Sequence, residues 1–337
     1  TGVNADPDTN TDTSDGYPIR QYRQGDEQDF VDLYNEVWSA EKTVEWFDWR
    51  YRDNPYVDEV SLFLAEYGGR VVATAPFNAF RVRAGEETRL AFLCTDVVTD
   101  SGHRRRGLFR RTTGRALAHY AGRPPDERPA FLFNHANQFS LPGYERMGWE
   151  YYSSQVRYNR LQYAGSYVTD LVGGWLGRLA GSAATGLNRA YVGLRDRRAE
   201  FETGPFDVER RDEVPAGEFA ACYGACRPDP VHVVYDEAFY EWRFAEPGNA
   251  PDAVYLVRRA GRPVAGLVTH RTDDPRNETT VVTVSHVVPA AGGPERVAAL
   301  AAAFEHLLAD YRRADLLRTT NPLVPAPILR AYGFAPD

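Results

Sequence analysis

The pattern of hydrophobic and polar positions predicts the same order of elements twice along this chain. In the first half, apolar residues at helical spacing over 25–38 and 46–51 precede segments typical of strands, over 60–66, 70–82 and 88–98. In the second half, strand-like segments from 253 to 288 repeat this three-strand meander. An internal repeat of this length indicates two structural units of one design.

The repeat is clearest around a Trp-Arg pair. Residues 47–51 (Phe-Asp-Trp-Arg-Tyr) match residues 240–244 (Tyr-Glu-Trp-Arg-Phe) in chemical type at every position. A segment kept in both copies is expected to preserve a fold element rather than a binding site. We therefore interpret these residues mainly as packing, with Arg50 and Arg243 tying helix to sheet.

After residue 98 the pattern alternates between helix and strand. Helical spacing predicts helices over 104–120 and 137–147, with an apolar strand over 130–133 between them and a last strand over 149–158. Such alternation implies locally parallel strand pairing. The predicted fold class is therefore α/β (α+β-like), with a central mixed β-sheet flanked by helices in each unit.

The predicted organisation is a first domain over 17–160, a helical linker over 161–204 and a second domain over 205–337. Residues 1–16, rich in Asp, Thr and Asn, predict a disordered acidic tail without the apolar region of a signal peptide. Within 167–194, apolar residues at helical spacing indicate helices that dock the two halves. The alternative is a membrane-surface helix, whose polar face should carry a band of Lys and Arg that this segment lacks.

Composition narrows the function classes. With 337 residues, 43% hydrophobic and 26% charged, the chain has room for two ordinary globular domains. It has no apolar run of about 18 residues, which excludes a membrane span. Its three cysteines show no metal-ligand spacing, and their odd number argues against a disulfide framework, so we expect no metal and a reducing, cytoplasmic location.

The charge balance is unusual. Lys42 is the only lysine, and Asp and Glu outnumber the basic residues by 47 to 39, for a net charge of −8. Loss of lysine with an acidic excess is typical of salt-adapted proteins or of a GC-rich genome. A net negative chain is also a poor general binder of nucleic acid.

Two runs of residues carry candidate chemistry. Over 97–110 a strand leads through a short turn into a helix N-terminus that bears Gly107 and flanking arginines, which exposes unpaired backbone N–H groups beside positive charge and suits a pyrophosphate. The alternative is a solvated basic helix start. The second run, over 133–149, follows the apolar strand and places Asn137 seven residues before Tyr144.

Together these runs resemble the GNAT superfamily of acyl-CoA-dependent N-acyltransferases. Residues 104–109 (Arg-Arg-Arg-Gly-Leu-Phe) resemble its cofactor motif, Arg/Gln-x-x-Gly-x-Gly/Ala, and residues 137–149 resemble its second motif, Asn-x-x-Ala-x-x-x-Tyr-x-x-x-Gly-Phe. The second copy lacks the cofactor motif and has Ala-Ala-Gly-Gly-Pro over 290–294. The resemblance therefore implies a catalytic GNAT domain with the CoA motif over 17–160 and a degenerate one over 205–337, most similar to the enhanced-intracellular-survival branch without its third domain.

The resemblance implies acetyl-CoA as a co-substrate. Phe109 departs from the family's Gly or Ala, and a side chain pointing away from the cofactor would accommodate this. Asn137 has an alternative role as a helix cap. The implied cofactor-binding residues are Val97 and Val98 through their backbone, and Arg104, Arg105, Arg106, Gly107, Leu108, Phe109 and Asn137.

The resemblance also implies the reaction, in which a primary amine attacks the thioester directly within a ternary complex. Tyr144 is the predicted proton donor to the thiolate, because the pKa of a phenol lies close enough to that of a thiol. Its alternative is a packed tyrosine at a helix end. Asp96 and His135 are the candidate general bases, and the carboxylate of Asp337 is a third because the chain's own terminus serves in the resembled branch.

Three other functions are compatible with parts of this pattern. A tandem aminoacyl or peptidyl transferase would share the doubled fold but has no need of a CoA diphosphate site, and a CoA-binding protein without catalysis would not need Tyr144. A nucleic-acid patch over 104–115 is disfavoured by the net charge. The expected partner is a small-molecule or peptide amine acceptor. The chain can also form a homo-oligomer, since the sequence leaves the oligomeric state open. No nucleic acid and no membrane span are expected.

Overall fold

The chain folds into two compact units in a computed structural model that describes residues 16–125, 127–163, 174–199, 201, 204–274 and 279–337. The first unit comprises Thr1–Tyr152 with Asp229–Val234, and the second comprises Ser153–Pro228 with Tyr235–Asp337. The tail predicted over 1–16 lies outside the described residues except for Gly16. The same holds for 164–173 of the predicted linker.

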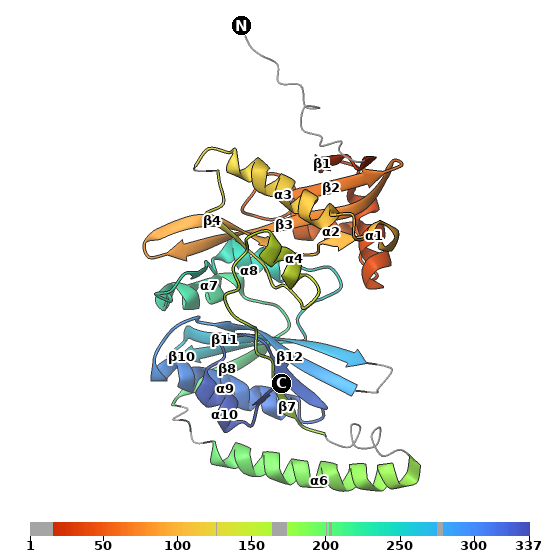
Figure 1. Cartoon of the computed structure of the whole chain (residues 1–337). Helices are drawn as coiled ribbons and strands as arrows, with labels where there is room; N and C mark the ends of the chain where they lie inside the picture. Colours follow the sequence, from red (N-terminus) through yellow and green to blue (C-terminus); the bar gives the residue numbers. More distant parts are fainter. Residues whose placement is uncertain (1–15, 126, 164–173, 200, 202–203, 275–278) are drawn as a thin grey trace. The chain divides into compact units, whose positions relative to one another are not determined.

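The first unit is built on a mixed sheet in the order β1-β2-β3-β4-β6 (Figure 1). The strands β1 to β4 are antiparallel neighbours, and β6 runs parallel to β4. Two short strands, β5 and β9, pair with β3. The strands are β1 (Ile19–Gln21), β2 (Leu62–Tyr67), β3 (Arg70–Ala84), β4 (Glu87–Cys94), β5 (Val98–Thr99), β6 (Phe131–Phe133) and β9 (His232–Val233).

Helices complete the core of the first unit. The helix α3 packs on β1, β2 and β3, and its buried Ala116 and Tyr120 join a cluster of phenylalanines from the sheet. The helix α1 packs on β3 and β5. The helices are α1 (Glu27–Trp38), α2 (Val44–Phe47), the π-helix η3 (Asp48–Arg52), the 3-10 turn η4 (Ser101–His103), α3 (Leu108–Ala121) and α4 (Leu141–Arg146).

The second unit has its own mixed sheet, in the order β14-β7-β13-β12-β11-β10-β8, in which β12 and β13 are parallel. The helix α9 packs on β8, β10 and β11, as α3 does on its sheet. The strands are β7 (Tyr158–Leu161), β8 (Phe206–Arg211), β10 (Ala253–Arg259), β11 (Arg262–Asp274), β12 (Thr279–Val288), β13 (Leu316–Thr319) and β14 (Ala335–Pro336). The helices are α6 (Gly174–Arg198), α7 (Ala216–Ala225), α8 (Glu237–Arg243), α9 (Pro294–Asp310) and α10 (Ala326–Ala331).

The strand registers confirm the internal repeat. In the first unit Cys94 lies opposite Phe77, and in the second Val284 lies opposite Thr269. Likewise, Val98 lies opposite Thr74 in the first unit, and Val288 lies opposite Gly266 in the second. Each unit thus carries a bulge of one extra residue at the same place, and the predicted fold class, two mixed sheets flanked by helices, is confirmed.

Three predicted elements need correction. The strand expected over 88–98 is interrupted after Cys94. The helix expected from 104 begins at Leu108, because Arg105 and Gly107 adopt left-handed backbone angles, with φ of 61° and 74°. The helix expected from 137 begins at Leu141, after a capped turn.

The strand predicted over 149–158 was wrong, and with it the position of the domain boundary. Residues 149–157 form no strand, and the neighbours Tyr151 and Tyr152 are both exposed, so neither face is buried against a sheet at this point. The strand β7 follows instead, and it pairs with β13 and β14 of the second unit. The first unit accordingly ends at Tyr152 rather than at 160.

The predicted linker contains one long helix, α6, which belongs to the second unit. It contacts α10, and Asn188 donates a hydrogen bond from Nδ2 to the Leu161 carbonyl at 2.9 Å. Its apolar residues Leu187, Tyr191 and Leu194 are exposed. No helix in the described part of the chain is long and apolar enough to cross a membrane.

A buried histidine occupies the bulge of the second unit. His286 is buried, and its Nε2 lies 3.2 Å from the Tyr240 hydroxyl. Burial lowers the pKa of His286 to about 3, and the nearby charge of Arg243 adds to the effect. Four aromatic rings surround the imidazole, those of Tyr235, Phe239, Tyr240 and Phe244.

This burial predicts a pH-dependent stability. Below the ordinary histidine pKa of about 6.5, the unfolded chain binds a proton that folded His286 does not, so the free energy of unfolding falls as the pH falls. Relative to His286→Gln, the parent should lose up to about 1.4 kcal/mol per pH unit between about pH 6 and 3, measured by urea denaturation. Exposed His306, as His306→Gln, is the control and should leave the slope unchanged; parallel curves for parent and His286→Gln would contradict the prediction.

Candidate active site

The bulge of the first unit is centred on Asp96. This residue has a φ of 53°, unusual for a residue other than glycine, and stands between the end of β4 and the start of β5. Its Oδ2 accepts hydrogen bonds from Arg50 Nε at 2.5 Å and from the Tyr51 hydroxyl at 2.8 Å. Burial alone would lower the pKa of the Arg50 guanidinium, but the Asp96 charge outweighs it and the pKa is raised. The predicted tie between helix and sheet at Arg50 is confirmed.

The pairing of β4 with β6 ends just before the bulge, and we call the region beyond its last pair the gap between β4 and β6. Their parallel pairing ends at Leu93 and Phe133, whereas the equivalent pairing in the second unit continues to Val284 and Thr319. Within the described part of the chain, the Val97 amide donates no hydrogen bond. Backbone donors that open towards such a gap are suited to receive a substrate carbonyl.

A second donor lies at the same gap. Asn134 directly follows β6, and its buried Nδ2 faces the Tyr144 hydroxyl, to which it is a weak hydrogen-bond donor. A buried donor that is so weakly satisfied costs free energy, which favours a bound molecule that supplies a better acceptor.

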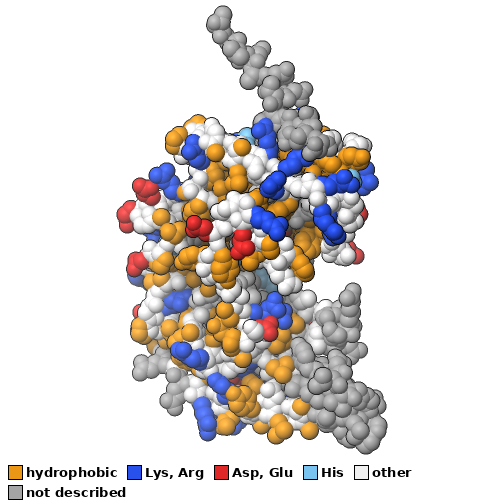
Figure 2. All heavy atoms as spheres, in the orientation of Figure 1, with side chains coloured by type: hydrophobic (Ala, Val, Ile, Leu, Met, Phe, Trp, Pro, Cys, Tyr) orange, Lys and Arg blue, Asp and Glu red, His pale blue; other side chains and the backbone are white. Residues whose placement is uncertain are grey.

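The helix α3 presents the basic N-terminus that the sequence predicts. Gly107 is its N-cap residue, with a φ of 74° and no side-chain cap, so the first backbone N–H groups of the helix lack intrahelical acceptors. The space where a Cβ of Gly107 would stand is open. Arg104, Arg105 and Arg106 are exposed, and Figure 2 shows Lys and Arg side chains gathered on this side of the first unit. These features fit a diphosphate.

The arginine-bearing loop is held in place by Tyr17. The Tyr17 hydroxyl lies 3.0 Å from His103 Nδ1, and its carbonyl accepts a hydrogen bond from Arg111 Nη2 at 3.0 Å. The Arg106 guanidinium lies over the Tyr17 ring, 5.8 Å from its centroid. The loop is thus braced on its apolar side while its arginines stay exposed.

Phe109 joins the two predicted motifs. Its ring meets the Tyr144 ring edge-on, with centroids 4.9 Å apart, and lies so close to Gly143 that a Cβ there would stand 2.6 Å from the Phe109 ring. The large residue at this motif position therefore packs against α4. Trp149, 4.8 Å away, holds the other side of Tyr144.

The Tyr144 hydroxyl meets a thiol. Its oxygen lies 3.2 Å from Cys94 Sγ, and both side chains are buried. Burial raises the pKa of Tyr144 well above its usual range; Cys94 adds to this shift and Asn134 opposes it. Burial likewise raises the pKa of the Cys94 thiol to about 12. Both groups therefore stay protonated at neutral pH.

The remaining predicted site residues make other contacts. Asn137 Oδ1 accepts hydrogen bonds from the amides of Phe139 and Ser140, at 2.9 and 3.0 Å, which is the capping role given as its alternative. His135 is exposed, with its ring near that of Phe133. Asp337 belongs to the second unit, where its carboxylate pairs with Arg157 at 3.4 Å.

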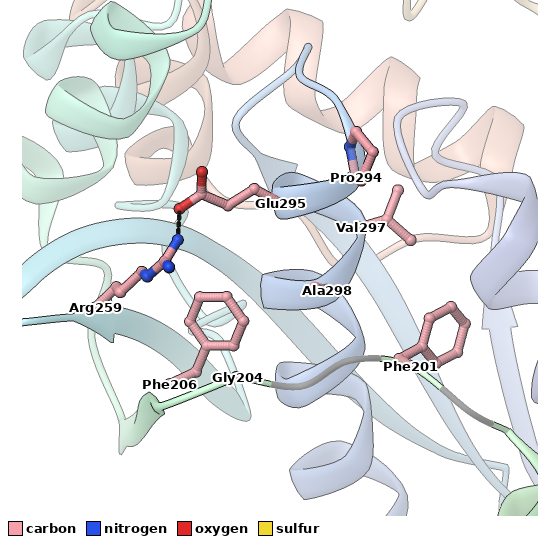
Figure 3. Close-up of a pocket in the computed structure, with 8 residues that line it drawn as sticks. All are labelled: Phe201, Gly204, Phe206, Arg259, Pro294, Glu295, Val297 and Ala298. Carbon is pink, nitrogen blue, oxygen red and sulfur yellow. Dashed lines mark hydrogen bonds and ion pairs between the residues drawn. The ribbon is translucent and has the colours of Figure 1, made fainter.

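The second unit lacks these features at its equivalent helix. The helix α9 begins with Pro294, which has no N–H, and Glu295, whose charge opposes an anion. A pocket of about 620 Å³ lies beside this first turn, where Arg259 pairs with Glu295 and Phe206 lines the wall (Figure 3). None of the predicted site residues lines it.

Sequence reasoning missed Cys94, Asn134 and Tyr17. From the sequence alone, we considered Cys94 only as a metal ligand or a disulfide partner. Among the described residues there is no group of three or more His, Cys, Asp or Glu that could hold a metal ion. The repeat held no direct signal for Cys94, because the spacing of 192 residues between Gly69 and Gly261 sets Cys94 against His286. Only the strand registers match Cys94 with Val284 and so show a polar residue where the other copy is apolar.

Comparisons with known proteins bear on the family and the fold. A family model described as "Acetyltransferase (GNAT) domain" matches residues 18–152. Comparison with curated protein sequences gave no match. Eis1 from Mycobacterium abscessus is 15% identical, with 95% of this chain and 70% of that chain covered and a TM-score of 0.57.

Two further solved structures share the fold. A probable N-acyltransferase from Enterococcus faecalis is 10% identical, with 95% of this chain and 70% of that chain covered and a TM-score of 0.62. The N-myristoyltransferase of Saccharomyces cerevisiae with bound myristoyl-CoA is 12% identical, with 96% and 81% covered and a TM-score of 0.59. At these identities the likeness concerns the fold.

The family model identifies a GNAT acetyltransferase domain in the first unit, and this domain makes the protein an acyltransferase. That domain spans residues 18–152. The resemblance drawn from the two motifs is thereby confirmed.

The Asp96 contacts lead to a stability prediction. Asp96→Asn tolerates the same backbone angle but leaves Arg50 as a poorly paired, largely buried charge, so it should lower the free energy of unfolding by about 3 kcal/mol. Glu86→Gln, which removes a carboxylate that is 97% exposed, should cost less than about 1 kcal/mol. Denaturant titration distinguishes the two. An Asp96→Asn protein of parental stability without acyl transfer would instead indicate a general base.

Proposed function

We propose that the protein is an acetyl-CoA-dependent N-acetyltransferase whose active site lies in the first unit. The observation that carries this proposal is the contact of Phe109 with Tyr144, which joins the basic N-terminus of α3 to a buried phenol beside the gap between β4 and β6. The acceptor is a primary amine on a small molecule or a peptide.

The residues around the start of α3 would hold the diphosphate of the co-substrate. The backbone N–H groups from Gly107 to Phe109 and the positive end of the helix supply donors, and the exposed arginines 104–106 supply charge. Leu108 anchors the turn from inside, since its side chain is buried beside Tyr17 and Ile19. Phe109 contributes its amide while its ring packs on α4.

The gap between β4 and β6 would receive the thioester. The Val97 amide is the donor to the carbonyl oxygen, and Val98, opposite Thr74 in the ladder, fixes the strand behind it. Asn137 shapes the neighbouring turn through its cap. Bound there, the thioester supplies the acyl group that the neutral amine attacks.

Proton transfers fall to two side chains. Tyr144, held protonated by burial, donates to the departing thiolate sulfur. Among the predicted bases, Asp96 is occupied by Arg50 and Tyr51 and acts by holding the bulge. His135 is exposed just beyond β6 and takes the proton of the amine.

The second unit would serve the fold rather than the transfer. It repeats the meander and the helix on the sheet, but its equivalent helix opens with Pro294 and Glu295, which suit no anion. We interpret 205–337 as a degenerate GNAT-like domain.

Binding of the co-substrate tests the α3 site. Gly107→Glu should weaken acetyl-CoA binding at least about tenfold in calorimetric titration, because a carboxylate at the helix N-terminus repels the diphosphate. Gly107→Ala carries similar backbone strain without the charge, and Gly114→Glu carries the charge on the exposed face of the same helix. Both controls should bind more tightly than Gly107→Glu. Equal binding by all variants, or none by the parent, would refute the site.

Transfer itself tests Tyr144. Tyr144→Phe should lower kcat about 100-fold with little change in acetyl-CoA affinity, because it removes the proton donor and keeps the ring. Release of thiol in the presence of a panel of primary amines measures the rate. Tyr158→Phe, in β7 of the second unit, is the control for loss of a hydroxyl and should leave kcat unchanged. Parental turnover by Tyr144→Phe would assign the protein to CoA binding without this acid.

A further inference from the structure

Three polar side chains meet where β4 and β6 part: Cys94 at the end of β4, Asn134 after β6 and Tyr144 in α4. The repeat shows what the fold itself places there. Strand registers match Cys94 with Val284 and Asn134 with Thr319. The helix ends match Tyr144 with Leu329, since the carbonyl of each accepts a hydrogen bond from the amide five residues later, Trp149 or Phe334.

At the three equivalent positions the second unit has two apolar side chains and one hydroxyl that is hydrogen-bonded. Val284 and Leu329 are buried and apolar. The Thr319 hydroxyl donates a hydrogen bond to the Val284 carbonyl at 3.0 Å. The fold therefore does not require a thiol or a phenol at these positions. Burying such polar groups costs free energy unless they are paired, so their presence in the first unit points to a role other than packing.

The ring of Tyr144 is fixed by apolar contacts, but its hydroxyl direction is not. Phe109 and Trp149 contact the ring from two sides, and Gly143 leaves room for Phe109. Two polar groups bear on rotation about the C–O bond: Cys94 Sγ, 3.2 Å from the phenol oxygen in a contact where either atom can donate, and the Asn134 side chain. When the thiol donates, the phenol proton points away from the thiol.

We propose that Cys94 is a positioning residue for Tyr144: its S–H donates to the phenol oxygen and so turns the phenol proton towards the gap between β4 and β6. This proposal rests on the acyl-transfer function proposed above. It gives the buried thiol a role in the reaction without contact with the substrate.

The proton count is simple. As the C–S bond of the thioester breaks, the phenol proton passes to the departing sulfur, and the phenolate oxygen left behind accepts a stronger hydrogen bond from Cys94. The thiol keeps its proton throughout, since burial raises its pKa to about 12. A protonated, buried thiol is also a poor nucleophile, so Cys94 does not carry the acyl group. The phenolate then regains a proton from water.

Three variants test this role. Cys94→Val, the residue of the second unit, should lower kcat about tenfold with an unchanged KM for acetyl-CoA, and Cys94→Ser should restore kcat to within about threefold of the parent. The control is Cys222→Val, which removes an equally buried thiol of the second unit, with its pKa also raised to about 12. It should leave kcat unchanged. Equal loss of kcat in Cys94→Val and Cys222→Val would overturn the proposal.

A double-mutant cycle shows whether Cys94 acts through Tyr144. In the Tyr144→Phe background, Cys94→Val should cause no further loss of kcat, because the group it positions is gone. The same tenfold loss in both backgrounds would mean that Cys94 acts by another route, which refutes the proposal.

A spectroscopic measurement separates this proposal from the function on which it rests. The S–H stretching band of Cys94, identified as the infrared band lost in Cys94→Ser, should shift in Tyr144→Phe because the hydrogen bond is removed. A shifted band together with no acyl transfer by the parent would refute the transferase function and the role of Cys94 in it, while confirming the contact. An unshifted band would refute the contact and therefore the positioning role even in an active enzyme.

Discussion

The contact of Asp96 with Arg50 and Tyr51 is the constraint on which the site depends. A carboxylate on a residue with left-handed backbone angles is held by a guanidinium and a phenol, both from the π-helix η3. This contact fixes where β4 stops and where β5 resumes beside β3. Because β6 follows β4 only as far as Leu93, the bulge also decides where the sheet opens and which amide faces the gap.

The second unit shows that the bulge does not depend on the polar residues of the first unit. There the same extra residue is accommodated, but an imidazole takes the place of the carboxylate, and its partner is the Tyr240 hydroxyl within a ring of aromatic side chains. A neutral buried histidine stabilises the fold without creating a charged site. Comparing the two units therefore distinguishes the features that the sheet itself requires from those found in the first unit. The latter are the arginines before α3, the exposed helix N-terminus and the Cys94–Tyr144 pair.

Particular residues show how far the sequence could be read. The repeat at 47–51 and 240–244, the arginine motif and the spacing of Asn137 and Tyr144 led to the correct fold class and to the family of the domain over 18–152. The start of α3 was placed four residues early, because helical spacing does not reveal that Arg105 and Gly107 take left-handed angles. The strand expected over 149–158 failed because alternation of residue types cannot show whether a partner strand exists, and β7 found its partners in the second sheet. The roles of the site residues stay predictions.

By itself the sequence determined the periodic elements, their duplication and the motif that marks the first unit, since these depend on residue types at short spacing along the chain. Only the tertiary structure decided that Asp96 belongs to Arg50, that Phe109 turns onto Tyr144 and that a thiol 50 positions away meets the phenol. These contacts join residues distant in sequence through the pairing of strands and the docking of helices. Their partners are chosen by burial and hydrogen bonding in three dimensions, which no local pattern encodes.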